Sequence, residues 1–257
     1  MNLSIPKDAW SRDIGSELTD YLLRGVSHPT CLRGGRFMKR KLINWLGLTG
    51  IIALLSYTAA VVFSPLAYPG YNWMEQAVSD LSAQNAPSKM LWEQLAALYG
   101  ICSVVCPTCV SIYVNEVVHK GKSPMSRLFR IGMYLFTIMN WVSAVGYKMF
   151  PLTDSGKEIA SFQEVMHIVV TVLVVVLSIT SLICLIIAGF RKGGVRGIGV
   201  WAAIALVMMF IGSVGTGIVP PEYFGIVERF SVFAAVGFNA VLGWYLFAGS
   251  RVFKVGH

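Results

Sequence analysis

Six long apolar segments dominate this sequence and constrain its fold more than any other feature. A transmembrane helix needs roughly 20 predominantly apolar residues, and in lipid every backbone polar group has to be paired within the spanning structure. The segments of this length are 42–63, 90–114, 128–150, 165–190, 198–219 and 226–248. They predict an all-α polytopic membrane bundle of six transmembrane helices.

The composition supports lipid as the solvent of this chain and excludes two other classes. Hydrophobic residues make up 55% of it and charged residues 13%, against about 25% charged residues in soluble domains. A transmembrane β-barrel needs alternating segments of about 10 residues, and these segments are continuous and longer. The net charge of +8 is not gathered in a compact basic domain, so we expect no nucleic-acid partner. The expected partner is the lipid bilayer.

The positions of lysine and arginine predict the orientation. Seventeen of the 21 lie before the first segment, in or beside the second and fourth loops, or in the tail. The other four are Lys89, Lys148, Lys157 and Arg229. Cytoplasmic loops carry the excess of positive charge, so we expect both termini in the cytoplasm and a multi-pass protein of the cell (plasma or inner) membrane.

The first segment is preceded by a polar leader. We divide the chain into a cytoplasmic leader (1–41), a transmembrane domain (42–248) and a short cytoplasmic tail (249–257). The leader has no apolar core of the kind that marks a signal peptide. It is interpreted either as a loose tail, with a true start at Met38, or as a cytoplasmic amphipathic helix. The second interpretation rests on one apolar face, formed by Leu18, Tyr21, Leu22 and Val26.

Polar residues gather at the predicted outer ends of the segments. They are Ser79 and Asp80 in the first outer loop, Asp154 after the third segment, His167 near the start of the fourth, and Glu228 and Arg229 near the start of the sixth. Charged groups in membrane helices indicate a functional site by default. We take His167 and Asp80 as candidate acid and base. Ser79, Asp154, Glu228 and Arg229 are the candidate ligand-binding residues.

A structural explanation competes with this one. Charged side chains at helix ends reach the interface cheaply, and Glu164 and Glu228 suit the first turns of their helices. Arg229 and a carboxylate could form a structural ion pair. A lone histidine is commonly a hydrogen-bonded helix contact, and no His-x-x-x-His pair accompanies His167. We therefore expect neither a metal nor a cofactor.

Three cysteines follow one face of the second segment. Cys102, Cys106 and Cys109 are spaced i, i+4 and i+7, and Cys106 and Cys109 have the spacing of a redox motif. That motif normally opens a helix in a soluble fold, whereas this one lies inside an apolar segment. We interpret these residues as small apolar side chains.

Four short motifs occur in order, each at an outer end. They are Ser79-Asp80-Leu81-Ser82, then Phe150-Pro151 with Asp154, then His167, then Gly225 to Glu228-Arg229. Over residues 42–248 the chain resembles the domain-of-unknown-function 998 family of prokaryotic six-helix membrane proteins. The resemblance implies the same fold and a site at these positions, and it implies no reaction. Lys148 departs from the apolar residues expected before Phe150.

These observations leave three functions open. The leading hypothesis is binding or processing of a lipid-like molecule at the outer leaflet, with Arg229 holding an anionic head group. A structural or accessory membrane protein is the alternative, and a small-molecule transporter is the third. A cavity through the bundle would favour transport, a closed pocket at the outer rim would favour lipid chemistry, and a fully packed core would favour the structural function.

Overall fold

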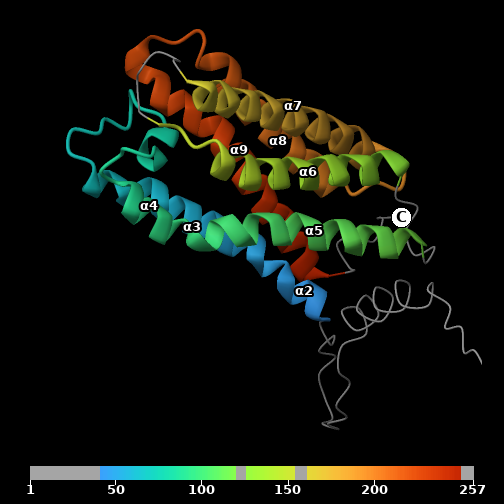
Figure 1. Ribbon diagram of the computed structural model, residues 1–257. Coiled ribbons are helices and arrows are strands. Elements are labelled where there is room, and N and C mark those ends of the chain that lie inside the picture. The colour runs from blue at the N-terminus through green and yellow to red at the C-terminus, as the bar shows by residue number, and fades with distance from the viewer. Residues whose placement is uncertain (1–40, 120–125, 154–160, 250–257) are drawn as a thin grey trace, which may run out of the picture.

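The computed structural model describes residues 41–119, 126–153 and 161–249. Within this part of the chain, six segments are long and apolar enough to cross a membrane (Figure 1). They are Leu42–Ala67, Ala97–Glu116, Arg127–Met149, Phe162–Phe190, Arg196–Gly215 and Pro221–Ala248. The predicted all-α bundle of six spans is confirmed, and the chain is a multi-pass membrane protein.

The helices of these spans, and the short α4 that precedes the second span, have the following bounds. They are α2 (Leu42–Leu46), α3 (Leu48–Phe63), α4 (Lys89–Leu95), α5 (Ala97–His119), α6 (Arg127–Met149), α7 (Phe162–Phe190), α8 (Arg196–Gly215) and α9 (Phe224–Ala248). Of the short 3-10 turns, η1 (Ser64–Ala67) ends the first span, η2 (Ser79–Ser82) lies in the loop that follows, and η3 (Pro221–Tyr223) begins the sixth span. Residues 1–40 of the predicted leader and 250–257 of the predicted tail lie outside the described part, so the division of the chain stays a prediction.

The helices follow one another around a ring. Each of α3, α5, α6, α7, α8 and α9 packs against the next, and α9 closes the ring on α3 and also contacts α5. In Figure 1, α6, α7 and α8 lie on one side and α3, α4 and α5 on the other, with α9 between them. This order brings the starts of α7 and α9 to the same end of the bundle as the loop 64–88.

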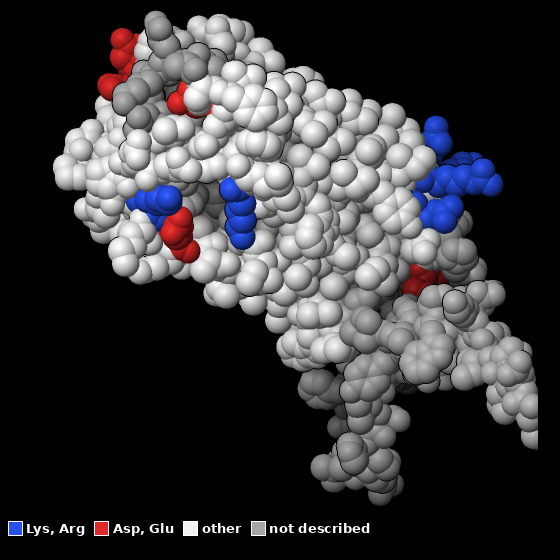
Figure 2. Space-filling model, viewed as in Figure 1, with Lys and Arg blue, Asp and Glu red and all other residues white. Residues whose placement is uncertain are grey.

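The two ends of the bundle differ in charge. We call the end with residues 64–88 the loop end and the opposite end the basic end. At the basic end, α6, the α7–α8 turn and the start of α8 carry Arg127, Arg130, Arg191, Lys192 and Arg196, and Figure 2 shows these basic groups gathered there. That the basic end faces the cytoplasm remains a prediction.

One predicted boundary is wrong, at the start of the second span. The segment 90–114 was expected to be continuous, but α4 ends at Leu95 and α5 begins at Ala97. The Ser56 hydroxyl of α3 donates to the Leu95 carbonyl (2.5 Å) and accepts from the Tyr99 N–H (3.1 Å). These two groups would bond each other in a continuous helix, so the inserted hydroxyl explains the break.

Proline inside α5 is matched by a side chain of α9. Pro107 has no N–H, so the carbonyl four residues earlier, on Ser103, loses its helical donor. The Asn239 amide of α9 donates to that carbonyl at 3.0 Å. Both residues are buried. An interhelical hydrogen bond thus replaces an intrahelical one, as lipid requires.

The packed core lies toward the basic end. Phe129 and Phe136 of α6, Leu185 of α7 and Leu242 of α9 are at most 1% exposed and belong to one cluster. Buried residues on α6 end at Asn140, although the helix continues to Met149. Near the loop end a separate small cluster joins Tyr57, Val61, Val78 and Val236. The interior is therefore tightly packed over only part of its length.

Candidate functional site

The loop end is built on the first turn of α9. The N–H groups of Gly225 and Ile226 both donate to the Met74 carbonyl, at 2.8 and 3.3 Å. These are among the N–H groups that lack a partner within a helix. A Cβ on Gly225 would collide with the carbonyl oxygens of Trp73 and Gln76, so only glycine permits this close approach of the loop.

Arg229 fixes the same loop from the side. Its guanidinium donates to the Gln76 carbonyl (3.1 Å), the Gly225 carbonyl (2.5 Å) and the Tyr71 hydroxyl (2.8 Å). The Tyr71 hydroxyl in turn donates to the Ala77 carbonyl at 2.9 Å. We call Tyr71, Gln76, Gly225 and Arg229 the loop anchor. These hydrogen bonds join α9 to a loop some 150 residues earlier in the sequence.

Two predicted carboxylates lie beside the loop anchor. Asp80 Oδ2 accepts from the Ala77 N–H at 3.0 Å, and Glu228 Oε2 accepts from the Val78 N–H at 3.1 Å. Glu228 lies within electrostatic reach of both Arg229 and Asp80. Burial raises the pKa of the Tyr71 phenol above its ordinary value, Arg229 opposes that shift, and Asp80 and Glu228 add to it. The structure therefore brings Asp80, Glu228 and Arg229 together.

His167 lies on the interior face of α7. It precedes the fully buried Leu185 by 18 residues, or about five helical turns, so the two side chains share a face. Its Nδ1 is 2.9 Å from the Phe150 carbonyl oxygen. Because a carbonyl only accepts, Nδ1 carries the proton, and in the neutral ring Nε2 is left with a lone pair.

Three further side chains face the interior at the level of His167. Tyr147 lies about five turns from the fully buried Phe129 of its helix, and Glu228 about five turns from the fully buried Leu246. Tyr99 lies about three turns from the fully buried Val110, so each shares the interior face of its helix. The Tyr147 ring is 5.1 Å from the His167 ring, and its hydroxyl donates to Thr171 at 3.2 Å. Tyr99 and Glu228 both lie within electrostatic reach of Tyr147.

These four residues line a recess at the edge of the loop-end cluster, against which Tyr99 packs with its ring 4.7 Å from that of Tyr57. Tyr99, Tyr147, His167 and Glu228 point into the bundle, yet each retains partial exposure. Their helical counterparts deeper in the bundle are fully buried. Figure 2 shows a hollow on the face that carries α4, α5 and α6, close to the loop end. We call the space bounded by these four side chains the recess.

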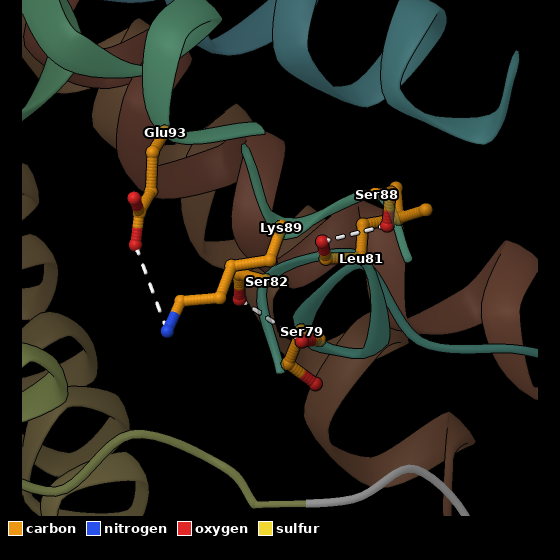
Figure 3. Close-up of polar contacts among 6 residues, drawn as sticks. All are labelled: Ser79, Leu81, Ser82, Ser88, Lys89 and Glu93. Atoms are coloured by element: carbon orange, nitrogen blue, oxygen red, sulfur yellow. Dashed lines mark hydrogen bonds and ion pairs between the residues drawn. The ribbon is translucent and has the colours of Figure 1, made fainter. Parts of the chain in front are cut away.

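The remaining predicted residues have other positions. Ser79 lies in η2, where its carbonyl accepts from the Ser82 hydroxyl at 2.9 Å (Figure 3). Glu164 caps α7 by accepting from the Ser161 N–H at 3.0 Å, which agrees with its structural interpretation. Asp154 lies outside the described residues. Within the described part, no group of three or more His, Cys, Asp or Glu residues could hold a metal ion.

Sequence reasoning missed the tyrosines of this region. Tyr71 belongs to the loop anchor, and Tyr99 and Tyr147 line the recess. A tyrosine in an apolar segment does not reveal whether it faces lipid or the interior. The spacing of Tyr147 from Phe129 is the one signal that places it inward, and it is usable only once Phe129 is known to be buried.

Comparison with known proteins identifies a family without assigning a function. Searches of curated proteins and of solved structures give no match. The family described as "Protein of unknown function (DUF998)" matches residues 51–245. This range contains the loop anchor, the recess and all of the motifs on which the sequence resemblance rests. The chain therefore belongs to the DUF998 family of proteins of unknown function.

Proposed function

We propose that this protein binds the head group of an amphiphile from the leaflet at its loop end, and that the recess receives the head group. The observation that carries the proposal is a pair of hydrogen-bond acceptors in the recess. Among the described residues, His167 Nε2 has no hydrogen-bond partner. Glu228 Oε1 likewise accepts no hydrogen bond from them, since the Val78 N–H donates to Oε2. Both residues are partly exposed, so a donor from a ligand or from water can reach these acceptors.

The chemistry of the recess indicates the class of head group. A carboxylate and an imidazole lone pair accept hydrogen bonds, so the ligand should present O–H or N–H donors. Tyrosine rings at Tyr99 and Tyr147 provide flat apolar walls that suit the carbon atoms of such a group. If the bound molecule is also processed, His167 Nε2 is the group able to accept its proton.

The distribution of packing supports binding from one side. Phe129, Phe136 and Leu242 fill the interior toward the basic end, so the recess continues into a packed core instead of a passage. This arrangement favours a pocket at one rim over transport through the bundle.

A structural function has its own support in the loop anchor. Among the described residues, the hydrogen bonds of Arg229 all go to backbone carbonyls or to Tyr71, so Arg229 need not hold a ligand. We therefore assign the predicted ligand contact to the recess, and a structural role to Arg229.

Native mass spectrometry of the full chain in detergent tests the proposal. Dioleoyl phosphatidylglycerol and dioleoyl phosphatidylcholine have the same tails and a phosphate, but only the first carries head-group hydroxyl donors. We expect the chain to retain phosphatidylglycerol preferentially, and Glu228→Gln and His167→Phe to reduce that preference. Glu222→Gln, at an exposed residue of the same end, is the matched control. Equal retention of both lipids by every variant would refute the proposal.

A further inference from the structure

The seams between neighbouring helices are not equally closed near the loop end. Between α6 and α7, a Cβ on Gly146 would meet Val170 at 2.7 Å, and between α8 and α9 a Cβ on Gly212 would collide with Ser231. Between α5 and α6, a Cβ on Gly100 would have a single neighbour within 4 Å, the Lys148 Nζ at 3.8 Å. At Gly100 itself, therefore, only the end of a flexible side chain lies within 4 Å, although the neighbouring Tyr99 of α5 is hydrogen-bonded to Ser143 of α6.

Lys148 belongs to this seam rather than to the lipid-facing surface. It follows Thr137 by 11 residues, about three turns, so the two side chains share a side of α6. The Thr137 hydroxyl donates to the Pro107 carbonyl of α5 at 3.1 Å. Lys148 thus points toward α5, next to Gly100, which directly follows Tyr99 of the recess.

The charge of Lys148 has no counterion in the described part of the chain. The nearby Lys89 of α4 pairs with Glu93 at 3.9 Å (Figure 3), whereas Lys148 is exposed and the structure gives it no ion pair. Figure 2 shows basic side chains beside the hollow on this face. A positive charge thus stands at the opening of the recess toward the bilayer.

Apolar side chains continue the seam on the membrane side. Leu98 and Ile101 of α5 are 58% and 65% exposed, and Val145 and Met149 of α6 are 46% and 64% exposed. Acyl chains lying on these residues would remain in the bilayer while the head group turns into the recess.

We propose that the α5–α6 seam is a lateral entrance to the recess for an anionic membrane lipid, and that Lys148 binds its phosphate. This inference rests on the proposed function, because the entrance leads to the recess. It adds a phosphate to the ligand, a route through the bilayer, and a specificity-determining residue. The phosphate at Lys148 and hydroxyls at Glu228 and His167 together describe a phospholipid with a hydroxylated head group.

Two variants, each with a control, test separately the entrance through the α5–α6 seam and the charge of Lys148. Gly100→Leu fills the seam, and Gly237→Leu is its control, because a Cβ on Gly237 of α9 meets nothing within 4 Å. Lys148→Gln removes the charge, and Lys192→Gln removes one exposed charge at the basic end. Gly100 and Gly237 both lie in helices, where leucine is favoured over glycine, so both variants should fold.

Three probes are compared by native mass spectrometry: dioleoyl phosphatidylglycerol, dioleoylglycerol, which keeps the tails and a hydroxyl but lacks the phosphate, and sn-glycerol 3-phosphate, which lacks the tails. We expect Gly100→Leu to weaken retention of both lipids about tenfold or more. Lys148→Gln should weaken phosphatidylglycerol alone, by about threefold, the scale of an exposed ion pair. Glycerol phosphate should not be retained at the same concentration.

The outcomes distinguish the lateral entrance from the proposed binding of a head group in the recess. If wild-type protein retains neither lipid, both proposals fall. If it retains phosphatidylglycerol but Gly100→Leu and Lys148→Gln behave like their controls, the lateral entrance is overturned and the recess stands. Retention of glycerol phosphate as strong as that of the lipid would show a site for free phosphate and would also overturn the entrance.

Discussion

The hydrogen bond between Asn239 and the Ser103 carbonyl should exist because of Pro107, and a double-mutant cycle can test this cause. Asn239→Leu keeps the side-chain size and removes the 3.0 Å bond. Interhelical hydrogen bonds in membranes contribute about 0.6 kcal/mol on average and up to about 1.7. Here the loss also leaves a buried carbonyl unpaired, at about 1–3 kcal/mol.

One gain offsets part of that loss. Asn239 Oδ1 is buried without a partner, and leucine removes this unpaired acceptor. We therefore expect Asn239→Leu to lower the free energy of unfolding by about 1–2 kcal/mol. In a Pro107→Ala background, the restored N–H can donate to the Ser103 carbonyl, and the same substitution should cost less than about 0.5 kcal/mol. The coupling energy is then about 1 kcal/mol.

Reversible unfolding in mixed detergent and dodecyl sulfate micelles, followed by circular dichroism, measures each corner of the cycle. Asn140→Leu is the matched control. The Asn140 amide donates to the Phe136 carbonyl of its own helix, at 2.9 Å, and that carbonyl has a backbone donor as well. Asn140→Leu should show no coupling to Pro107→Ala. Additive effects of Asn239→Leu and Pro107→Ala would refute the explanation of this contact.

Three further predictions concern the loop end. Arg229→Lys loses the guanidinium that joins three acceptors and should lower the free energy of unfolding by about 1–3 kcal/mol in thermal melts. The loss should exceed that of Tyr71→Phe, and an unchanged melt would refute the stabilising role of the loop anchor. Because the folded-state pKa of Tyr71 is raised by burial, its contribution is present below about pH 10 and is lost as pH rises further, a loss that Tyr71→Phe should abolish in alkaline melts. Cysteines at the exposed Pro69 and Lys192 should be labelled by an impermeant maleimide in intact cells only at Pro69, and labelling at Lys192 would reverse the predicted orientation.

The spans were predictable because hydrocarbon thickness fixes the length of an apolar helix. The break between α4 and α5 was not, because its cause is Ser56, a residue of another helix 39 positions earlier. Hydropathy treats each segment alone and carries no information on which hydroxyl of a neighbour enters its hydrogen-bond ladder.

The gathering of Asp80, Glu228 and Arg229 followed from topology, since an even number of alternating spans returns these positions to one end. The partners of Arg229 did not follow. They are backbone carbonyls and a phenol, and carbonyls are present at every residue, so sequence favoured the carboxylates. Gly225 was the available signal, because a glycine at a helix start permits a loop to approach closely.

The interior side chains of three helices change in character along the bundle, and this change indicates where the recess lies. On α9 the interior stripe runs from Leu246 and Leu242, both 0% exposed, through Asn239 and Val236 to Glu228. On α6 it runs from Phe129 and Phe136 through Asn140 to Ser143 and Tyr147.

On α7 the interior stripe runs from Leu185 through Ser178 and Val170 to His167. On all three helices polar side chains appear on the interior face toward the loop end, and on α7 and α9 the buried Val170 and Val236 lie among them. The end of the hydrocarbon region does not explain these polar side chains, because the outer faces of the helices stay apolar up to Val145 of α6 and Val169 of α7. A bundle selected only for packing has no need of Tyr147, His167 and Glu228 on these faces, so their common level favours an interior built to hold a polar group.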